Sequence, residues 1–275
     1  MRHDGRGFAI LVGSALVVAI GRAVLACSWL ADLGAYTSEG PEDAGQVDAP
    51  GPFCKTLRDS AFCADFDEEG GLGPPWDPDP LFNMPYVASL DPDAFTSPPY
   101  SYESTALLSS PLPSSAWLHK NFPVVPDQVD VDYDLQLDSV DVADLKSYPF
   151  QLNFFQTSPQ DSWNIEVAFF QPAGGPVQGS VGLYAYGDAV VGYASLDPTL
   201  PIPLARWMHV HIHVVGLLHD AGTVTLSIDD RQAIVPQAFQ PSGEGGVDLY
   251  VGAYGAPEAQ NPTTVHVDNV VVDFE

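Results

Sequence analysis

Three aspartates at alternate positions, Asp130, Asp132 and Asp134, form the first arrangement in the chain that could do chemistry. In a β-strand such residues share one face at steps of about 6.6 Å. Retaining glycosidases use two carboxylates at a similar separation, one as nucleophile and one as acid, and crowding can raise the pKa of one of them. We therefore name these aspartates as candidate catalytic residues. The alternative is the solvated face of an ordinary strand.

Three histidines repeat the same spacing at His209, His211 and His213. Alternate imidazoles on a strand could bind Zn²⁺ if a third ligand came from a neighbouring strand. Asp130 or Asp132 could supply that ligand if the two strands are neighbours. The apolar residues that alternate with the histidines should face the core, so the histidines should lie on the opposite, solvent-facing side. We therefore favour an ordinary polar face over a metal site.

Aromatic side chains could form a platform for sugar rings, because a pyranose face stacks on an exposed ring. Trp207 shares a face with the histidines, and several tyrosines lie in or beside predicted strands: Tyr184, Tyr186, Tyr193, Tyr250 and Tyr254. We name Tyr184, Tyr186 and Trp207 as candidate ligand-binding residues. The alternative is that such rings are buried in the core.

Composition excludes several functions. The net charge is −27 with only 9 lysines and arginines, so the surface repels nucleic acid and offers no basic groove for a uronate polymer. The chain contains neither a Gly-x-Ser-x-Gly elbow nor a glycine-rich loop that opens a helix. No motif requires a cofactor. The many acidic residues could bind Ca²⁺, and solubility is the simpler explanation of the acidic composition. Zn²⁺ is disfavoured.

The N-terminus predicts export. Basic Arg2 and Arg6 precede an apolar run, residues 8–20, which is shorter than the roughly 20 residues of a membrane-spanning helix. The segment Val24-Leu25-Ala26-Cys27 that follows resembles a bacterial lipobox, which implies lipidation of Cys27 and a membrane anchor. The alternative is a secretory signal cleaved after Ala26.

The number of cysteines agrees with lipidation of Cys27. The chain has three cysteines, and acylation of Cys27 leaves an even pair, Cys54 and Cys63. Each of the two follows a phenylalanine, and turn-forming residues lie between them. We expect a disulfide, as suits an exported protein, rather than a metal pair, because no further cysteine is near.

We therefore expect three parts. Residues 1–26 form a lipoprotein signal peptide, and residues 27–52 form a flexible acidic tether rich in Gly, Pro, Ser and Thr. Residues 53–275 form one all-β domain, because apolar and polar residues alternate in many short segments separated by Gly and Pro. These predicted strands lie within residues 131–137, 150–154, 163–169, 210–214, 224–228, 247–251 and 270–274.

The segments Arg206-Trp207-Met208-His209-Val210 and 222–229 resemble the laminin-G signature of a Trp-His-Val strand followed by a Leu-x-Ile-Asp hairpin, although Asp230 stands where that family has glycine. Residues 62–67 and 265–272 resemble the opening and closing strands of concanavalin-like jelly rolls in bacterial lipoproteins. The resemblance implies an antiparallel β-sandwich whose first and last strands pair. Concanavalin-like glucanases carry Glu-x-Asp-x-Glu where this chain has three aspartates.

These observations predict a lipid-anchored module of the cell envelope that binds a neutral glycan or a protein partner without catalysis. A glycosidase that uses the Asp130–Asp134 strand is the alternative, and a purely structural envelope protein is the third. Ser28 lacks an acidic retention signal, which implies the outer membrane or the cell surface.

Overall fold

The computed structural model describes residues 53–57, 62–67, 72, 75–77, 81–83, 86–107, 114–124, 126–140, 147–155, 163–172, 174–185, 189–218, 221–239, 245–255 and 261–275. The chain divides into two units, Met1–Asp48 and Ala49–Glu275, and all described residues belong to the second. The predicted signal peptide, Cys27 and the tether lie outside the described residues. Among the described residues, no helix has the length and apolar character needed to cross a bilayer.

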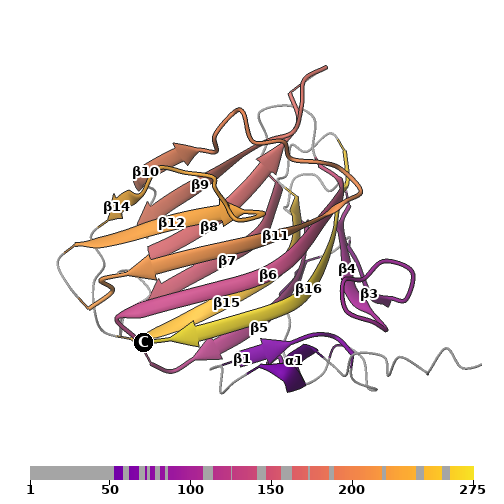
Figure 1. The fold of residues 1–275 in the computed structure, drawn as a ribbon, viewed down its shortest axis with the longest axis horizontal. Coiled ribbons are helices and arrows are strands. Elements are labelled where there is room, and N and C mark those ends of the chain that lie inside the picture. Colours follow the sequence, from indigo (N-terminus) through magenta and orange to yellow (C-terminus); the bar gives the residue numbers. More distant parts are fainter. Residues whose placement is uncertain are drawn as a thin grey trace, which may run out of the picture. The chain divides into compact units, whose positions relative to one another are not determined.

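The described part of the second unit consists almost entirely of antiparallel strands in two sheets, with one helical turn, α1 (Phe53–Thr56). Sheet A runs β13–β12–β11–β6–β16–β4–β3, with β1 paired to β16 and β14 paired to β12. Sheet B runs β10–β9–β8–β7–β15–β5–β2. Figure 1 shows β12, β11, β6 and β16 in front of the strands of sheet B.

The bounds of the strands of sheet A are β1 (Phe62–Ala64), β3 (Tyr86–Asp91), β4 (Ser101–Ala106), β6 (Gln128–Ser139), β11 (Trp207–Val215), β12 (Gly222–Ile228), β13 (Arg231–Gln232), β14 (Gln237–Phe239) and β16 (Thr263–Phe274). The bounds of the strands of sheet B are β2 (Leu81–Asn83), β5 (Ser114–Phe122), β7 (Ser147–Phe155), β8 (Trp163–Phe170), β9 (Gln178–Ala185), β10 (Ala189–Ser195) and β15 (Gly246–Gly255).

The core lies between the sheets and follows from alternation along the strands. On β6, every second residue from Val129 to Leu137 is fully buried, while the residues between them are partly exposed. The ring of Tyr133 on β6 stacks on Phe150 of β7 at 5.1 Å, which joins the two layers. The Tyr102 hydroxyl of β4 donates to the Ala116 carbonyl of β5 at 2.9 Å and joins them a second time.

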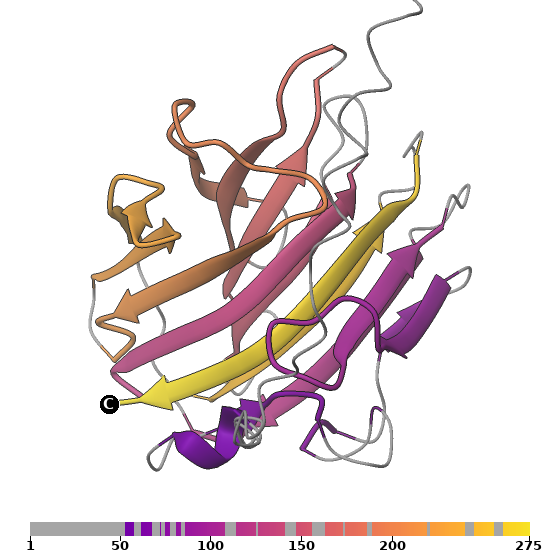
Figure 2. The same ribbon diagram turned by 45° about the vertical axis from the view of Figure 1, so that its right-hand side comes forward.

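The structure confirms the predicted all-β sandwich and the strands expected from alternation. It also confirms that the opening and closing strands pair, because Phe62 on β1 lies opposite Val272 on β16. Figure 2 shows β16 running beside β6 along its length. Cys54 and Cys63 form the predicted disulfide, which ties α1 to β1.

Buried carboxylates gather where β1 meets the centre of β16. Asp65 is 4% exposed, and Asp268 is fully buried beside a bulge in β16. Burial, followed by repulsion from Asp65 and Asp268, raises the pKa of Asp67 to about 7. The fold therefore favours the protonated form of Asp67.

The raised pKa of Asp67 should make the free energy of unfolding depend on pH. A folded pKa above the unfolded value means that its contribution to the free energy of unfolding is largest below about pH 4, falls as the pH rises to about 7, and then stays constant. We expect Asp67→Asn to stabilise the protein at pH 8 and to have little effect at pH 4, as measured by urea denaturation. The exposed control Asp273→Asn should show no such pH-dependent gain, and a gain of equal size in both variants would contradict the assignment.

Gly252 of β15 sets how closely β15 and β5 pack. Its φ is +132°, and a Cβ there would lie 2.1 Å from the carbonyl oxygen of Ala116 on β5. We expect Gly252→Ala to lower the free energy of unfolding by at least about 2–3 kcal/mol. Gly175→Ala is the control, because its Cβ would meet only Pro172 at 3.5 Å. Equal denaturation midpoints for the two variants would show that β15 is not held against β5 in this way.

Candidate functional site

The outer face of sheet A carries the aspartates and histidines that the sequence singles out. β6 and β11 pair antiparallel, with His209 opposite Asp134, His211 opposite Asp132 and His213 opposite Asp130. Each pair makes a hydrogen bond from the imidazole Nδ1 to the carboxylate, of 3.0, 2.9 and 2.7 Å respectively. The two motifs are therefore one ladder of three pairs, which we call the Asp–His ladder.

The ladder shifts the pKa values of Asp132, His209 and His211. Burial alone would raise the pKa of Asp132, but hydrogen bonds from His209 and His211 outweigh it and hold that pKa well below its ordinary value. Hydrogen bonds to Asp132 and Asp134 raise the pKa of His209 to about 10, and the bond to Asp132 raises the pKa of His211. His209 is thus a cation at neutral pH, and Asp132 is an anion.

Asp134 is held by a second set of contacts from the β3–β4 loop and the β16 bulge. Its Oδ2 accepts hydrogen bonds from Thr96 Oγ1 at 2.7 Å and Asn269 Nδ2 at 2.8 Å. These bonds and the one from His209 outweigh burial and lower the pKa of Asp134. A glycosidase needs one carboxyl group that stays protonated, so Asp132 and Asp134 are poor candidates for the acid. The catalytic role of Asp130, Asp132 and Asp134 stays a prediction.

The outer face of sheet B holds a polar array of which the sequence pattern indicates only Tyr250 and Tyr254. β15 lies between β5 and β7, so Tyr250 has His119 on one side and Gln151 on the other, and Glu166 of β8 follows next to Gln151. One row further along, Asp248 lies between Asn121 and Asn153. The side chains that form these two rows and the adjoining rings, which we call the sheet B face, are Trp117, His119, Asn121, Gln151, Asn153, Glu166, Asp248, Tyr250 and Tyr254.

Asp248 is the centre of the hydrogen bonding on the sheet B face. Its Oδ1 accepts from His119 Nε2 at 2.9 Å and from Asn121 Nδ2 at 2.8 Å, and its Oδ2 accepts from the Tyr250 hydroxyl at 3.2 Å. Burial and the neighbouring Asp248 raise the pKa of Tyr250. The hydroxyl is therefore neutral and acts as a donor at ordinary pH.

Aromatic rings adjoin this polar centre. The Trp117 ring stacks on Tyr254 at 5.2 Å and also contacts Tyr250 at 5.5 Å, and His119 stacks on Tyr250 at 4.8 Å. Trp117 and Tyr254 are partly exposed, whereas Tyr250 is only 8% exposed. The sheet B face therefore offers ring surface and hydrogen-bonding groups side by side, which is the combination that a sugar requires.

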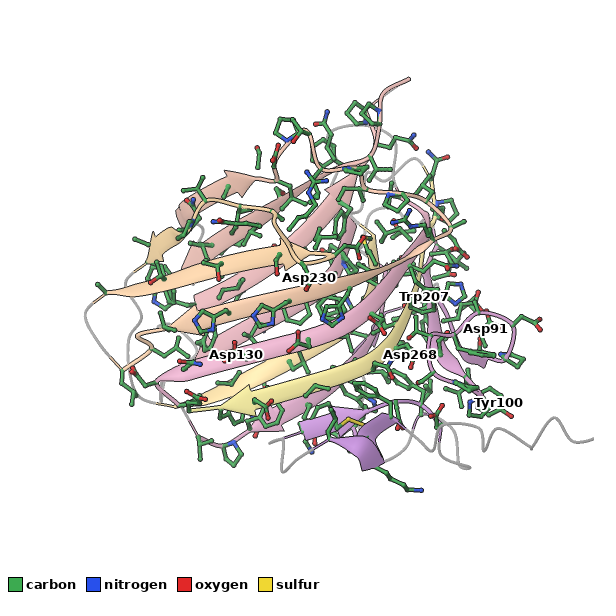
Figure 3. The ribbon with its side chains drawn as sticks, in the orientation of Figure 1. Asp91, Tyr100, Asp130, Trp207, Asp230 and Asp268 are labelled. Carbon is green, nitrogen blue, oxygen red and sulfur yellow. A yellow bond between two sulfur atoms is a disulfide. The ribbon has the colours of Figure 1, made fainter. Side chains whose placement is uncertain are left out.

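The two predicted ligand-binding residues that the structure describes, Tyr184 and Trp207, do not come together. Tyr184 lies on β9 of sheet B, with its ring over Gly182, and Tyr186 lies outside the described residues. Trp207 begins β11 of sheet A, where its ring packs edge-on against His266 at 6.3 Å. Figure 3 shows Trp207 on the front sheet with Asp130 and Asp268. Tyr184 and Trp207 therefore belong to different sheets, and their ligand roles stay predictions.

No lysine or arginine among the described residues lies on the sheet B face. Lys120 points to Asp77 at 3.3 Å, Lys55 lies on α1, Arg206 contacts Asp229 beyond β12, and Arg231 lies on β13 of sheet A. Among the described residues, the carboxylates on this face are those of Asp248 and Glu166, and the Asp77 carboxylate adjoins it, 3.7 Å from His119 Nδ1. Such a face suits a neutral ligand better than a polyanion.

Comparisons with known proteins address the fold alone. No family model matches the chain, and no curated protein matches it. Among solved structures, an endo-β-1,4-glucuronan lyase from the fungus Trichoderma reesei has a TM-score of 0.59 and 10% identity, over 78% of this chain and 96% of the lyase. A structure described with endo-acting O-glycanases of the human gut microbiota that initiate mucin breakdown has a TM-score of 0.50 and 10% identity, over 78% and 99% of the respective chains. These similarities support the β-sandwich jelly roll.

The role of Asp248 can be tested through stability. Asp248→Ala leaves His119, Asn121 and Tyr250 without their shared acceptor, and Asp248 is only 9% exposed. We expect the free energy of unfolding to fall by about 2–4 kcal/mol. Asp248→Asn keeps one acceptor oxygen and should cost clearly less in the same urea titration. Little or no loss in Asp248→Ala would contradict the role of Asp248 as the shared acceptor.

Proposed function

We propose that this protein recognises a neutral polysaccharide on the sheet B face. The observation that carries the proposal is the contact of Trp117, Tyr250 and Tyr254 with one another, directly beside the hydrogen-bonding groups centred on Asp248. Sugar rings stack on aromatic faces while their hydroxyls pair with amides, carboxylates and imidazoles. The two similar structures reported above are described with a glucuronan lyase and with endo-acting O-glycanases, which agrees with a glycan ligand.

The charge of the sheet B face supports a neutral ligand over an acidic one. The glucuronan lyase acts on a polyuronate, whose carboxylates would meet the carboxylates of Asp248 and Glu166 here. Since the described part of the face has no lysine or arginine to offset that repulsion, we propose a substrate class without uronates. The proposed location is the cell envelope, with Cys27 as the lipidated residue.

Cleavage is the second candidate function, and it rests on the close contact of three groups that can carry protons. His119 and Tyr250 both donate to Asp248, and their rings stack on each other. General acid–base chemistry requires such groups at hydrogen-bonding distance from the substrate. The neutral Tyr250 hydroxyl could act as an acid, whereas its raised pKa disfavours it as a base.

A panel of neutral and acidic polysaccharides tests both candidates. We expect the protein to bind at least one neutral polymer, and Trp117→Ala or Tyr254→Ala to weaken binding by at least about tenfold. Trp207→Ala on sheet A is the matched control and should leave the affinity unchanged. The measurement is affinity electrophoresis or calorimetry, with circular dichroism to confirm that each variant folds.

The same samples are assayed for new reducing ends and for unsaturated ends. Chain cleavage that is lost in both His119→Ala and Tyr250→Phe would promote the sheet B face to an active site. Binding without cleavage would establish a recognition module. If Trp207→Ala abolishes binding while Trp117→Ala does not, the proposed face is wrong, and silence in all readouts favours a protein partner or a structural role.

A further inference from the structure

A group of three side chains on the outer face of sheet A has the chemistry of a transition-metal site. Asp130 of β6 lies opposite His213 of β11, and His211 is next on the same face. The potential ligand atoms of Asp130, His211 and His213 all lie within 4.8 Å of one another, and each side chain is partly buried. We propose that these three residues bind a divalent transition-metal ion, with Zn²⁺ as the principal occupant. Figure 3 labels Asp130 on this face.

The distances suit such an ion. Asp130 Oδ1 lies 2.7 Å from His213 Nδ1 and 3.6 Å from His211 Nε2. Zinc bonds of about 2.0–2.2 Å in tetrahedral geometry separate ligand atoms by about 3.2–3.6 Å. The three ligand atoms already lie within 4.8 Å of one another, so the side chains would have to close in by little more than about 1 Å at most. Binding of the ion through His213 Nδ1 would take the place of the hydrogen bond between that nitrogen and Asp130.

Neighbouring groups already orient two of the three ligands. His211 Nδ1 donates to Asp132 Oδ1 at 2.9 Å, which directs Nε2 toward Asp130. Gln128 Nε2 donates to Asp130 Oδ2 at 2.8 Å, which leaves Oδ1 for the ion. A carboxylate behind a ligating imidazole is the usual support of a zinc ligand.

His209 does not fit this role, although it lies on the same face. Its Nε2 contacts Asp132 at 3.1 Å and its Nδ1 contacts Asp134 at 3.0 Å, so neither ring nitrogen is directed at Asp130. This difference makes His209 a matched control for His211 and His213.

The donor set determines the kind of ion. Two imidazole nitrogens and one carboxylate suit Zn²⁺ and its transition-metal neighbours, whereas Ca²⁺ and Mg²⁺ prefer oxygen ligands. Three protein ligands leave one tetrahedral position for water or an external ligand. The site lies on the opposite sheet from the sheet B face, so it does not depend on the proposed polysaccharide binding.

Metal binding to the untagged full chain tests the proposal. After chelator treatment and dialysis, Zn²⁺ is titrated in competition with a chromophoric chelator, and Co²⁺ is used to record a visible ligand-field spectrum. We expect one Zn²⁺ per chain with a Kd in the micromolar range or below, and no displacement by Ca²⁺. His211→Ala, His213→Ala and Asp130→Asn should each weaken binding at least about tenfold.

His209→Ala should bind Zn²⁺ like the parent protein. His213→Gln supplements His213→Ala, because it keeps side-chain volume if the alanine variant folds poorly, and circular dichroism confirms the fold of each. The proposal is overturned if the parent binds no Zn²⁺ at micromolar concentration. It is equally overturned if His209→Ala loses affinity as His213→Ala does, or if the double variant His211→Ala/His213→Ala retains the ion.

Discussion

The close packing of β15 between β5 and β7 is the constraint on which the candidate site depends. It requires a residue without a side chain at Gly252, because a Cβ there would run into the backbone of β5. Once that packing is made, the register places Tyr250 against His119 and Asp248 against Asn121. The two residues of each pair are more than a hundred positions apart in the sequence, so only the pairing of the strands brings them together. The chemistry of the sheet B face thus depends on the register of β15 against β5 and β7, which a side chain at Gly252 would disturb.

The aspartates on the outer faces of the two sheets have different hydrogen-bonding partners. The chain has 36 acidic and 9 basic residues, so most carboxylates cannot pair with lysine or arginine. On sheet A the partners are histidines, and their hydrogen bonds hold Asp132 ionised and His209 charged. On the sheet B face one carboxylate, Asp248, is served by an imidazole, an amide and a phenol. The first arrangement forms a ladder of hydrogen-bonded aspartates and histidines, and the second leaves groups that are suited to contact sugar hydroxyls.

The sequence predicts the fold well where one face of a strand is buried and the other is wet. β6 alternates without a break, so its existence and its inward face follow directly from the residue pattern. The disulfide follows from cysteine number and spacing, and the pairing of β1 with β16 follows from the family resemblance. β4 and β5 escape prediction because they bury polar residues such as Ser104 and Ser114, which interrupts the alternation.

The sites are less predictable, because they depend on pairing between distant strands. The two motifs of the Asp–His ladder are visible as separate patterns, and only the register of β6 against β11 shows that Asp130 faces His213. Trp117 and His119 carry no recognisable pattern of their own. Tyr250 and Tyr254 can be noted as aromatic residues on a predicted strand, but their partners come from β5 and β7. To predict that Tyr250 lies between polar residues of β5 and β7, one would have to know the strand order of sheet B.

Amide hydrogen exchange, recorded with and without a bound neutral oligosaccharide, tests the central claim most directly. Our account predicts slower exchange in β5, β7 and β15, which carry the sheet B face, and no change in β6 and β11 of sheet A. Protection confined to β6 and β11 would contradict the account and would place the ligand on the Asp–His ladder.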